Sequence, residues 1–77
     1  MMPFISKSAL LRLREIYKPG TRVELVKMDD FQASPPGTRG TVLGVDDIGS
    51  IMVSWDTGSS LSVAYGEDVC RVVNGDD

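Results

Sequence analysis

The amino-acid sequence predicts a small, mainly β domain: a strongly bent five-stranded barrel preceded by one amphipathic α-helix. Three observations predict this fold. Short runs of alternating apolar and polar residues recur at even spacing, turn-forming Gly, Asp and Pro separate the runs, and a helical apolar stripe precedes them all. The chain of 77 residues is too short for two packed sheets, and closure into a barrel removes most of the exposed sheet edge.

The sequence predicts a single domain in two parts, a helix within residues 1–19 and a β-barrel over residues 20–77. One cysteine, Cys70, excludes an internal disulfide, and this favours a reducing cytoplasm. The first residues lack the apolar run of a signal peptide. No apolar stretch approaches the ~20 residues that a membrane-spanning helix needs. We therefore expect a cytoplasmic protein.

Residues 6–17 have the periodicity of an amphipathic helix, because six apolar residues fall within one arc of a helical wheel. These are Ile5, Ala9, Leu10, Leu13, Ile16 and Tyr17. Ser6 is a suitable N-cap, and Pro19-Gly20 ends the helix. Leu11 lies outside the apolar arc, as either a singly exposed leucine or part of a self-association face.

The five predicted strands cover residues 21–28, 39–45, 50–55, 60–64 and 69–73. A long loop follows the first strand, since Asp29-Asp30 and Pro35-Pro36-Gly37 do not belong inside a sheet.

The second, third and fourth strands form a meander with two tight turns. Gly58 supplies the positive φ that the second turn requires, and Asp56 is expected to shape that turn through its side chain. Gly40 and Gly44 indicate bulges or a close approach of backbone.

Charge is distributed unevenly along the chain, whose net charge is -3. Residues 1–28 carry six basic and two acidic residues, which gives +4, and residues 29–77 carry two basic and nine acidic residues, which gives -7. An acidic total argues against a dedicated nucleic-acid binder. The basic front remains able to meet an anionic partner.

The side chains give no support for catalysis or for a metal site. The chain has no histidine, so Cys70 has no base to activate it and a zinc site is implausible. Three carboxylate pairs, Asp29-Asp30, Asp46-Asp47 and Glu67-Asp68, lack the spacing of a known cation-binding loop, and aspartates in turns usually bond their own backbone. We therefore predict a protein that is not an enzyme and binds no cofactor or metal.

Several segments together resemble a known family. They are Gly-Thr-Arg-Val-Glu-Leu-Val-x-Met-Asp-Asp (20–30), Pro-Gly-Thr-Arg-Gly-Thr-Val (36–42), Val-Asp-Asp-Ile-Gly-Ser-Ile (45–51) and Val-Ser-Trp-Asp-Thr-Gly-Ser-Ser-Leu (53–61), then Gly-Glu-Asp followed by Arg71. The chain resembles an uncharacterised family of small bacterial and phage proteins, a numbered domain of unknown function, the 4314 family. The resemblance covers nearly the whole chain. It implies an SH3-like barrel and a bacterial, phage or mobile-element origin, but no known activity.

The sequence departs from the family pattern at two places. Asp30-Phe31-Gln32 stands where the family has Asp-Pro-Tyr, so the long loop is rebuilt. Cys70 stands where a phenylalanine is usual, which favours a buried packing role for the thiol.

The first functional hypothesis is a non-enzymatic protein-interaction module. Its candidate contact residues are Asp29, Asp30, Phe31, Trp55 and Tyr65, and the acidic ones favour a basic protein partner. SH3-like barrels that bind peptides use aromatic-lined grooves beside a long early loop. Phe31 either contacts the partner or folds back over the barrel mouth. Trp55 alternates in phase with the apolar residues of its strand, which also fits a place in the core or at its rim.

The alternative hypothesis is a nucleic-acid-associated accessory protein. The basic helix would then contact phosphates through Lys7, Arg12, Arg14 and Lys18. The acidic barrel opposes this hypothesis unless the helix alone approaches the nucleic acid.

Overall fold

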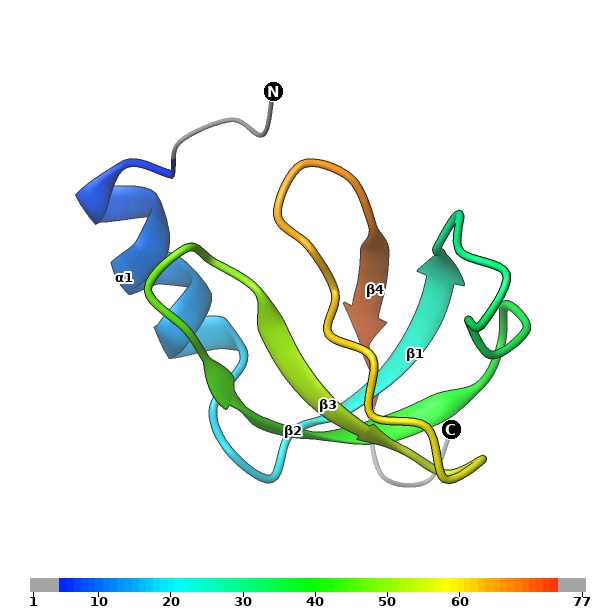
Figure 1. The fold of residues 1–77 in the computed structure, drawn as a ribbon. Helices are drawn as coiled ribbons and strands as arrows, with labels where there is room; N and C mark the ends of the chain where they lie inside the picture. The colour runs from blue at the N-terminus through cyan, green and yellow to red at the C-terminus, as the bar shows by residue number, and fades with distance from the viewer. Residues whose placement is uncertain (1–4, 74–77) are drawn as a thin grey trace.

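The computed structural model describes residues 5–73, which form one helix and one antiparallel sheet (Figure 1). The elements are α1 (Lys7–Ile16), β1 (Arg22–Lys27), β2 (Arg39–Val45), β3 (Ile51–Trp55) and β4 (Val69–Val72). The strand order is β3-β2-β1-β4, so the last strand of the chain lies beside the first. The predicted mainly β fold with one preceding helix is therefore confirmed.

Helix α1 has the predicted limits and the predicted cap. The Ser6 hydroxyl oxygen accepts a hydrogen bond from the Ala9 amide at 3.1 Å, and the Tyr17 amide donates to the Leu13 carbonyl at 2.8 Å. No residue of α1 is fully buried, and the helix lies at one end of the sheet, where it contacts β2 (Figure 1). Among the described residues no helix has the length and apolar character to cross a membrane.

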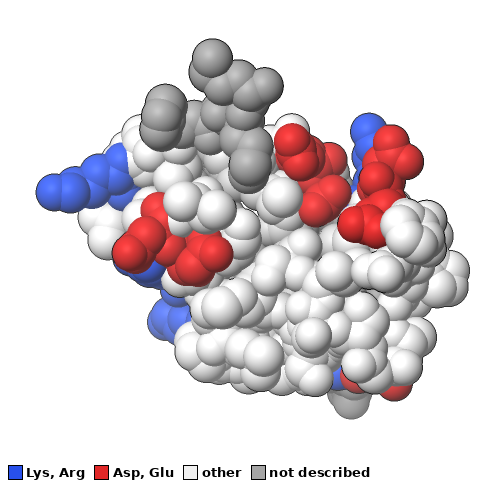
Figure 2. Space-filling model, viewed as in Figure 1, with Lys and Arg blue, Asp and Glu red and all other residues white. Residues whose placement is uncertain are grey.

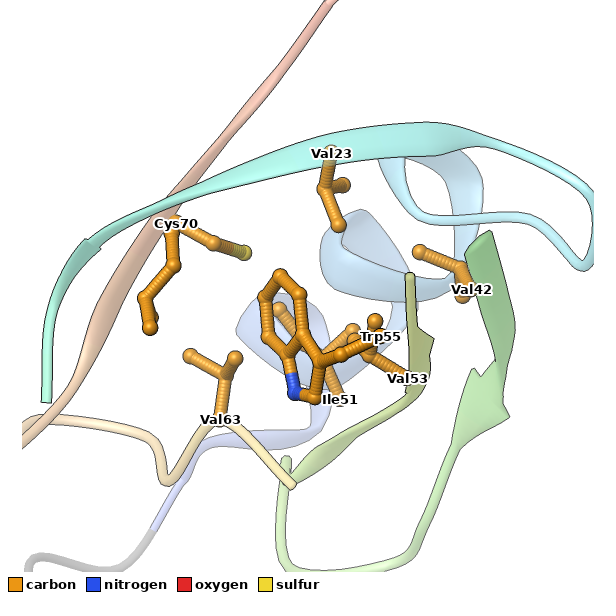
Figure 3. Packing of buried hydrophobic residues seen from close by; sticks show 8 residues of the cluster. Val23, Val42, Ile51, Val53, Trp55, Val63 and Cys70 are labelled. Carbon is orange, nitrogen blue, oxygen red and sulfur yellow. The ribbon is translucent and has the colours of Figure 1, made fainter. Parts of the chain in front are cut away.

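The core lies on one face of the bent sheet and gathers around the Trp55 ring (Figure 3). Strand β3 alternates strictly, with Ile51, Val53 and Trp55 buried and the two residues between them exposed. The other residues of the core cluster come from the remaining three strands and from one isolated bridge: Val23, Leu25, Val42, Val63 and Cys70. Burial of Cys70 agrees with the packing role that the sequence favours.

The predicted closed, five-stranded barrel is wrong. Strands β3 and β4 lie at opposite edges of an open sheet, and residues 60–64 form no strand. The backbone of this segment pairs with the sheet at one isolated bridge, between Ile51 and Val63. Its backbone serves Trp55 instead, because Ser59 and Leu61 carbonyls accept the amide and indole N–H of that residue at 2.9 and 2.8 Å.

Asp56 also differs from its prediction. Its carboxylate makes two hydrogen bonds to the Arg22 guanidinium, at 3.0 and 2.6 Å, and thereby joins the end of β3 to the start of β1. These bonds hold the pKa of Asp56 below its ordinary value. The turn itself is formed by the Gly58 amide, which donates to the Trp55 carbonyl, and by the positive φ of 96° at Gly58.

The two glycines of β2 have different roles. The ladder between β2 and β3 shifts register between Val42 and Gly44, which is the predicted bulge. Gly40 is the predicted close approach, because a Cβ there would lie 2.6 Å from Cγ1 of Val53 and 2.8 Å from Cε3 of Trp55. Added bulk at Gly40 would therefore push directly against the core.

We predict that Gly40→Ala lowers the free energy of unfolding by about 1–3 kcal/mol, the usual cost of overpacking a filled core. Gly44→Ala is the matched control, since its new Cβ would meet only the flexible end of Met52, at 3.3 Å. Urea unfolding followed by the fluorescence of Trp55, the single tryptophan, measures both variants. Equal unfolding midpoints for the two variants would contradict this account of Gly40.

Candidate functional site

The loop of residues 28–38 between β1 and β2, here called the Phe31 loop, is anchored at its base. The Leu25 amide donates to the Thr38 carbonyl, and the Gly37 amide donates back to the Leu25 carbonyl, both at 2.8 Å. Gly37 has a φ of 94°, which lets the chain turn back into β2. The loop therefore starts and ends on the sheet.

Side chains stabilise the tip of the same loop. The Asp30 carboxylate accepts the Gln32 amide at 2.8 Å, and the Asp30 carbonyl accepts the Ala33 amide at 2.9 Å. The Ser34 and Thr57 hydroxyls lie 2.7 Å apart and form a hydrogen bond that joins the loop to the turn after β3. These bonds hold the backbone on both sides of Phe31.

Phe31 projects from this loop into solvent with 97% of its surface exposed, well above every other large apolar residue within 5–73. The sequence left open whether the Phe31 ring contacts a partner or folds back over the barrel mouth, and this exposed position excludes the second arrangement. Asp29 and Asp30 lie next to it and are also exposed. The structure thus keeps three of the predicted contact residues together at one loop tip.

The other two predicted contact residues lie elsewhere. Trp55 is 3% exposed and belongs to the core, so its ring offers no contact surface. Tyr65 is half-buried and lines a cavity beside α1 together with Leu13 and Tyr17. The predicted five-residue surface is therefore not one site.

The basic side chains of the helix region are not all available to a partner. The Arg14 guanidinium bonds the Val45 carbonyl at 3.2 Å and the Asp47 carboxylate at 2.9 Å, which ties α1 to the turn after β2. Lys7, Arg12 and Lys18 are exposed and make no ion pair within residues 5–73. Three of the four residues assigned to phosphate contact thus remain accessible.

The cavity beside α1, here called the helix pocket, was not predicted from the sequence. It measures about 200 Å³ and lies between α1 and residues 63–70. Its walls include Leu13, Tyr17, Ile51, Tyr65, Asp68 and Cys70. These residues come from distant parts of the chain and share no sequence motif, so only the fold brings them together.

Burial in the helix pocket favours the neutral forms of two ionisable side chains, Cys70 and Tyr17. Burial raises the pKa of the Cys70 thiol to about 11 from an ordinary value of 9.0. Burial, and then the neighbouring Cys70, raises the pKa of the Tyr17 hydroxyl. A thiol with such a pKa is protonated at neutral pH and is a poor nucleophile. Within residues 5–73 no group of three or more Cys, Asp or Glu side chains is placed to hold a metal ion.

We predict that the free energy of unfolding falls as the pH rises from 9 through 11. In this interval the unfolded chain releases the Cys70 proton and the folded chain keeps it. Because unfolding then releases a proton, a rise in pH favours the unfolded state. At about 1.4 kcal/mol per pKa unit, the loss attributable to Cys70 is about 2–3 kcal/mol. Urea unfolding at several pH values measures it.

Cys70→Val is the control for this prediction, because it removes the thiol, together with the part of the Tyr17 pKa shift that the thiol causes, and leaves the remaining titrating groups unchanged. Its stability should decline less steeply over the same pH interval. Parallel declines for the variant and the wild-type protein would contradict the assignment to Cys70.

Comparison with known proteins identifies the family of the chain. The family model described as "Domain of unknown function (DUF4314)" matches residues 6–73. No curated protein and no solved structure matches the chain. The matched span includes α1, all four strands, the Phe31 loop and the residues of the helix pocket. The chain therefore belongs to the family described as a domain of unknown function, DUF4314.

Proposed function

We propose that the protein is a non-enzymatic protein-interaction module that binds its partner through the tip of the Phe31 loop. The observation that carries this proposal is the combination of a 97% exposed phenylalanine with a loop backbone bonded on both sides of it. An exposed large apolar side chain on a disordered segment would not indicate a binding site. An ordered loop that holds the ring in water supports a binding role.

The energetics of such a contact are favourable for an interaction module. Full burial of a phenylalanine side chain contributes about 1.5–3 kcal/mol. The hydrogen bonds on both sides of Phe31 already order the loop backbone. Binding would therefore cost little conformational entropy in the loop. The partner surface that fits Phe31 is an apolar pocket.

The charges around Phe31 favour a basic partner. Asp29 and Asp30 are exposed beside it, and they make no ion pair within residues 5–73. Figure 2 shows acidic side chains gathered over the loop after β1 and over the turn before β4, on one face of the molecule. Such rim charges raise the rate of association and select the partner more than they add affinity.

A photo-crosslinking amino acid at position 31 tests this proposal in cells that make the protein. We predict a discrete crosslinked protein from position 31 and none from position 43, since Leu43 is also exposed, at 59%, but lies outside the loop. Excess wild-type or Leu43→Ala protein should compete for the crosslink, and Phe31→Ala should compete at least about tenfold less well, as loss of about 1.4 kcal/mol requires.

Both competitors should unfold within about 0.5 kcal/mol of the wild-type protein, because both side chains are exposed. The proposal fails if Phe31→Ala competes as well as Leu43→Ala, or if position 31 gives no crosslink.

A nucleic-acid-associated role is the second proposal, and the exposure of Lys7, Arg12 and Lys18 supports it. Because Arg14 is engaged by Asp47, three side chains at most would contact phosphates in this state. Few contacts imply weak binding that depends modestly on salt, since each neutralised phosphate of duplex DNA contributes about -0.9 to the slope of log K against log salt.

A titration of labelled duplex DNA, single-stranded DNA and RNA at low and moderate salt tests the second proposal. We predict for it a duplex slope no steeper than about -3 and loss of binding in a Lys7→Glu, Arg12→Glu double variant. Lys27→Glu, which reverses an exposed charge away from the helix, is the control. Absence of binding even at low salt would exclude this role.

A further inference from the structure

The helix pocket combines an apolar interior with aromatic rings and one acidic group. Leu13, Ile51 and Cys70 provide apolar wall, and Tyr17 and Tyr65 provide two aromatic side chains. Among the lining residues within 5–73, Asp68 is the only Asp, Glu, Lys or Arg, and the buried Cys70 thiol keeps its proton at neutral pH. No Lys or Arg of residues 5–73 lines the pocket. Its chemistry therefore suits a cation carried on an apolar stem.

Asp68 is held in place at the pocket. One oxygen of its carboxylate accepts the Ala64 amide at 2.9 Å, which fixes the side chain against the turn before β4. Its other oxygen has no hydrogen-bond partner within residues 5–73. One carboxylate oxygen thus remains able to accept a hydrogen bond from an ammonium group.

The size of the pocket restricts its occupant. Pockets that bind drug-sized ligands and cofactors usually measure about 300–1,000 Å³, and the helix pocket measures about 200 Å³. It is thus too small for a nucleotide or a large cofactor, and a single long side chain is the appropriate scale. Lysine combines four methylene groups with a compact ammonium group, which matches an apolar wall beside a carboxylate.

We propose that the helix pocket binds a lysine side chain of a protein partner. The methylene groups pack against Leu13 and Ile51, and the ammonium group pairs with Asp68 beside the tyrosine rings. This inference rests on the proposed function in one respect, that the lysine belongs to a protein. The pocket would thus receive one basic residue of the partner at a place separate from the Phe31 loop.

NMR titration of the full chain with Nα-acetyl-lysine N-methylamide, whose ε-ammonium group is free, tests the pocket without the partner. The expected result is saturable shifts of amides in residues 13–17 and 63–70, and binding at least tenfold weaker for the norleucine analogue, which lacks the ammonium group. Asp68→Asn keeps an acceptor for the Ala64 amide and removes the charge, and it should also weaken lysine binding at least tenfold.

Two control variants make the outcome specific. Glu67→Gln removes a neighbouring exposed charge that does not line the pocket, so it should leave lysine binding within twofold of the wild-type value. Phe31→Ala should also leave it unchanged, so the pocket is tested separately from the Phe31 loop.

Three results would overturn the inference: no saturable shifts, equal binding of the lysine and norleucine compounds, or equal losses in Asp68→Asn and Glu67→Gln. Putrescine, added as a free diamine, tests the source of the ammonium group. Binding of putrescine more than tenfold tighter than the lysine compound would overturn the assignment to a protein partner.

Discussion

The fold depends on the way Trp55 is held at the end of β3. Its ring packs against Gly40, where no side chain intervenes, and its indole N–H donates to the Leu61 carbonyl. Its backbone N–H and carbonyl bond Ser59 and Gly58. One residue therefore fills the core and fixes the path of the irregular segment after β3. Because that segment bonds Trp55, it cannot pair along its length as a strand, and the sheet stays open between β3 and β4.

Both candidate sites follow from this arrangement. The segment after β3 has its isolated backbone bridge to the sheet at Val63, and residues 63–66 then line the helix pocket. The turn fixed by Trp55 also places the Thr57 hydroxyl against Ser34, which ties the Phe31 loop to the end of β3. The core around Trp55 thus positions both surfaces, since Ile51, Val63 and Cys70 of this core also line the helix pocket.

Local patterns predicted most of the secondary structure, because capping and alternation act over a few residues. Ser6 as the N-cap and the four strands of the sheet followed from such patterns. Residues 60–64 did not, since Leu61 and Val63 alternate as in a strand while the Leu61 carbonyl bonds an indole six residues earlier. The pairing of Arg14 with Asp47 and the walls of the helix pocket join distant segments, which a single sequence does not reveal. Composition alone marked Phe31 as the one large apolar residue within 29–38, and the structure places its ring in solvent.

Measurements of ¹⁵N relaxation in the Phe31 loop, together with NOEs from the Phe31 ring, test most directly whether an ordered loop holds this ring in water. We expect backbone order parameters near 0.85 through residues 28–38, close to those of rigid backbone. We also expect no NOE between the Phe31 ring and core residues such as Trp55. Order parameters below about 0.6 in the loop, or strong NOEs from the ring to the core, would contradict an ordered loop that holds the ring in water.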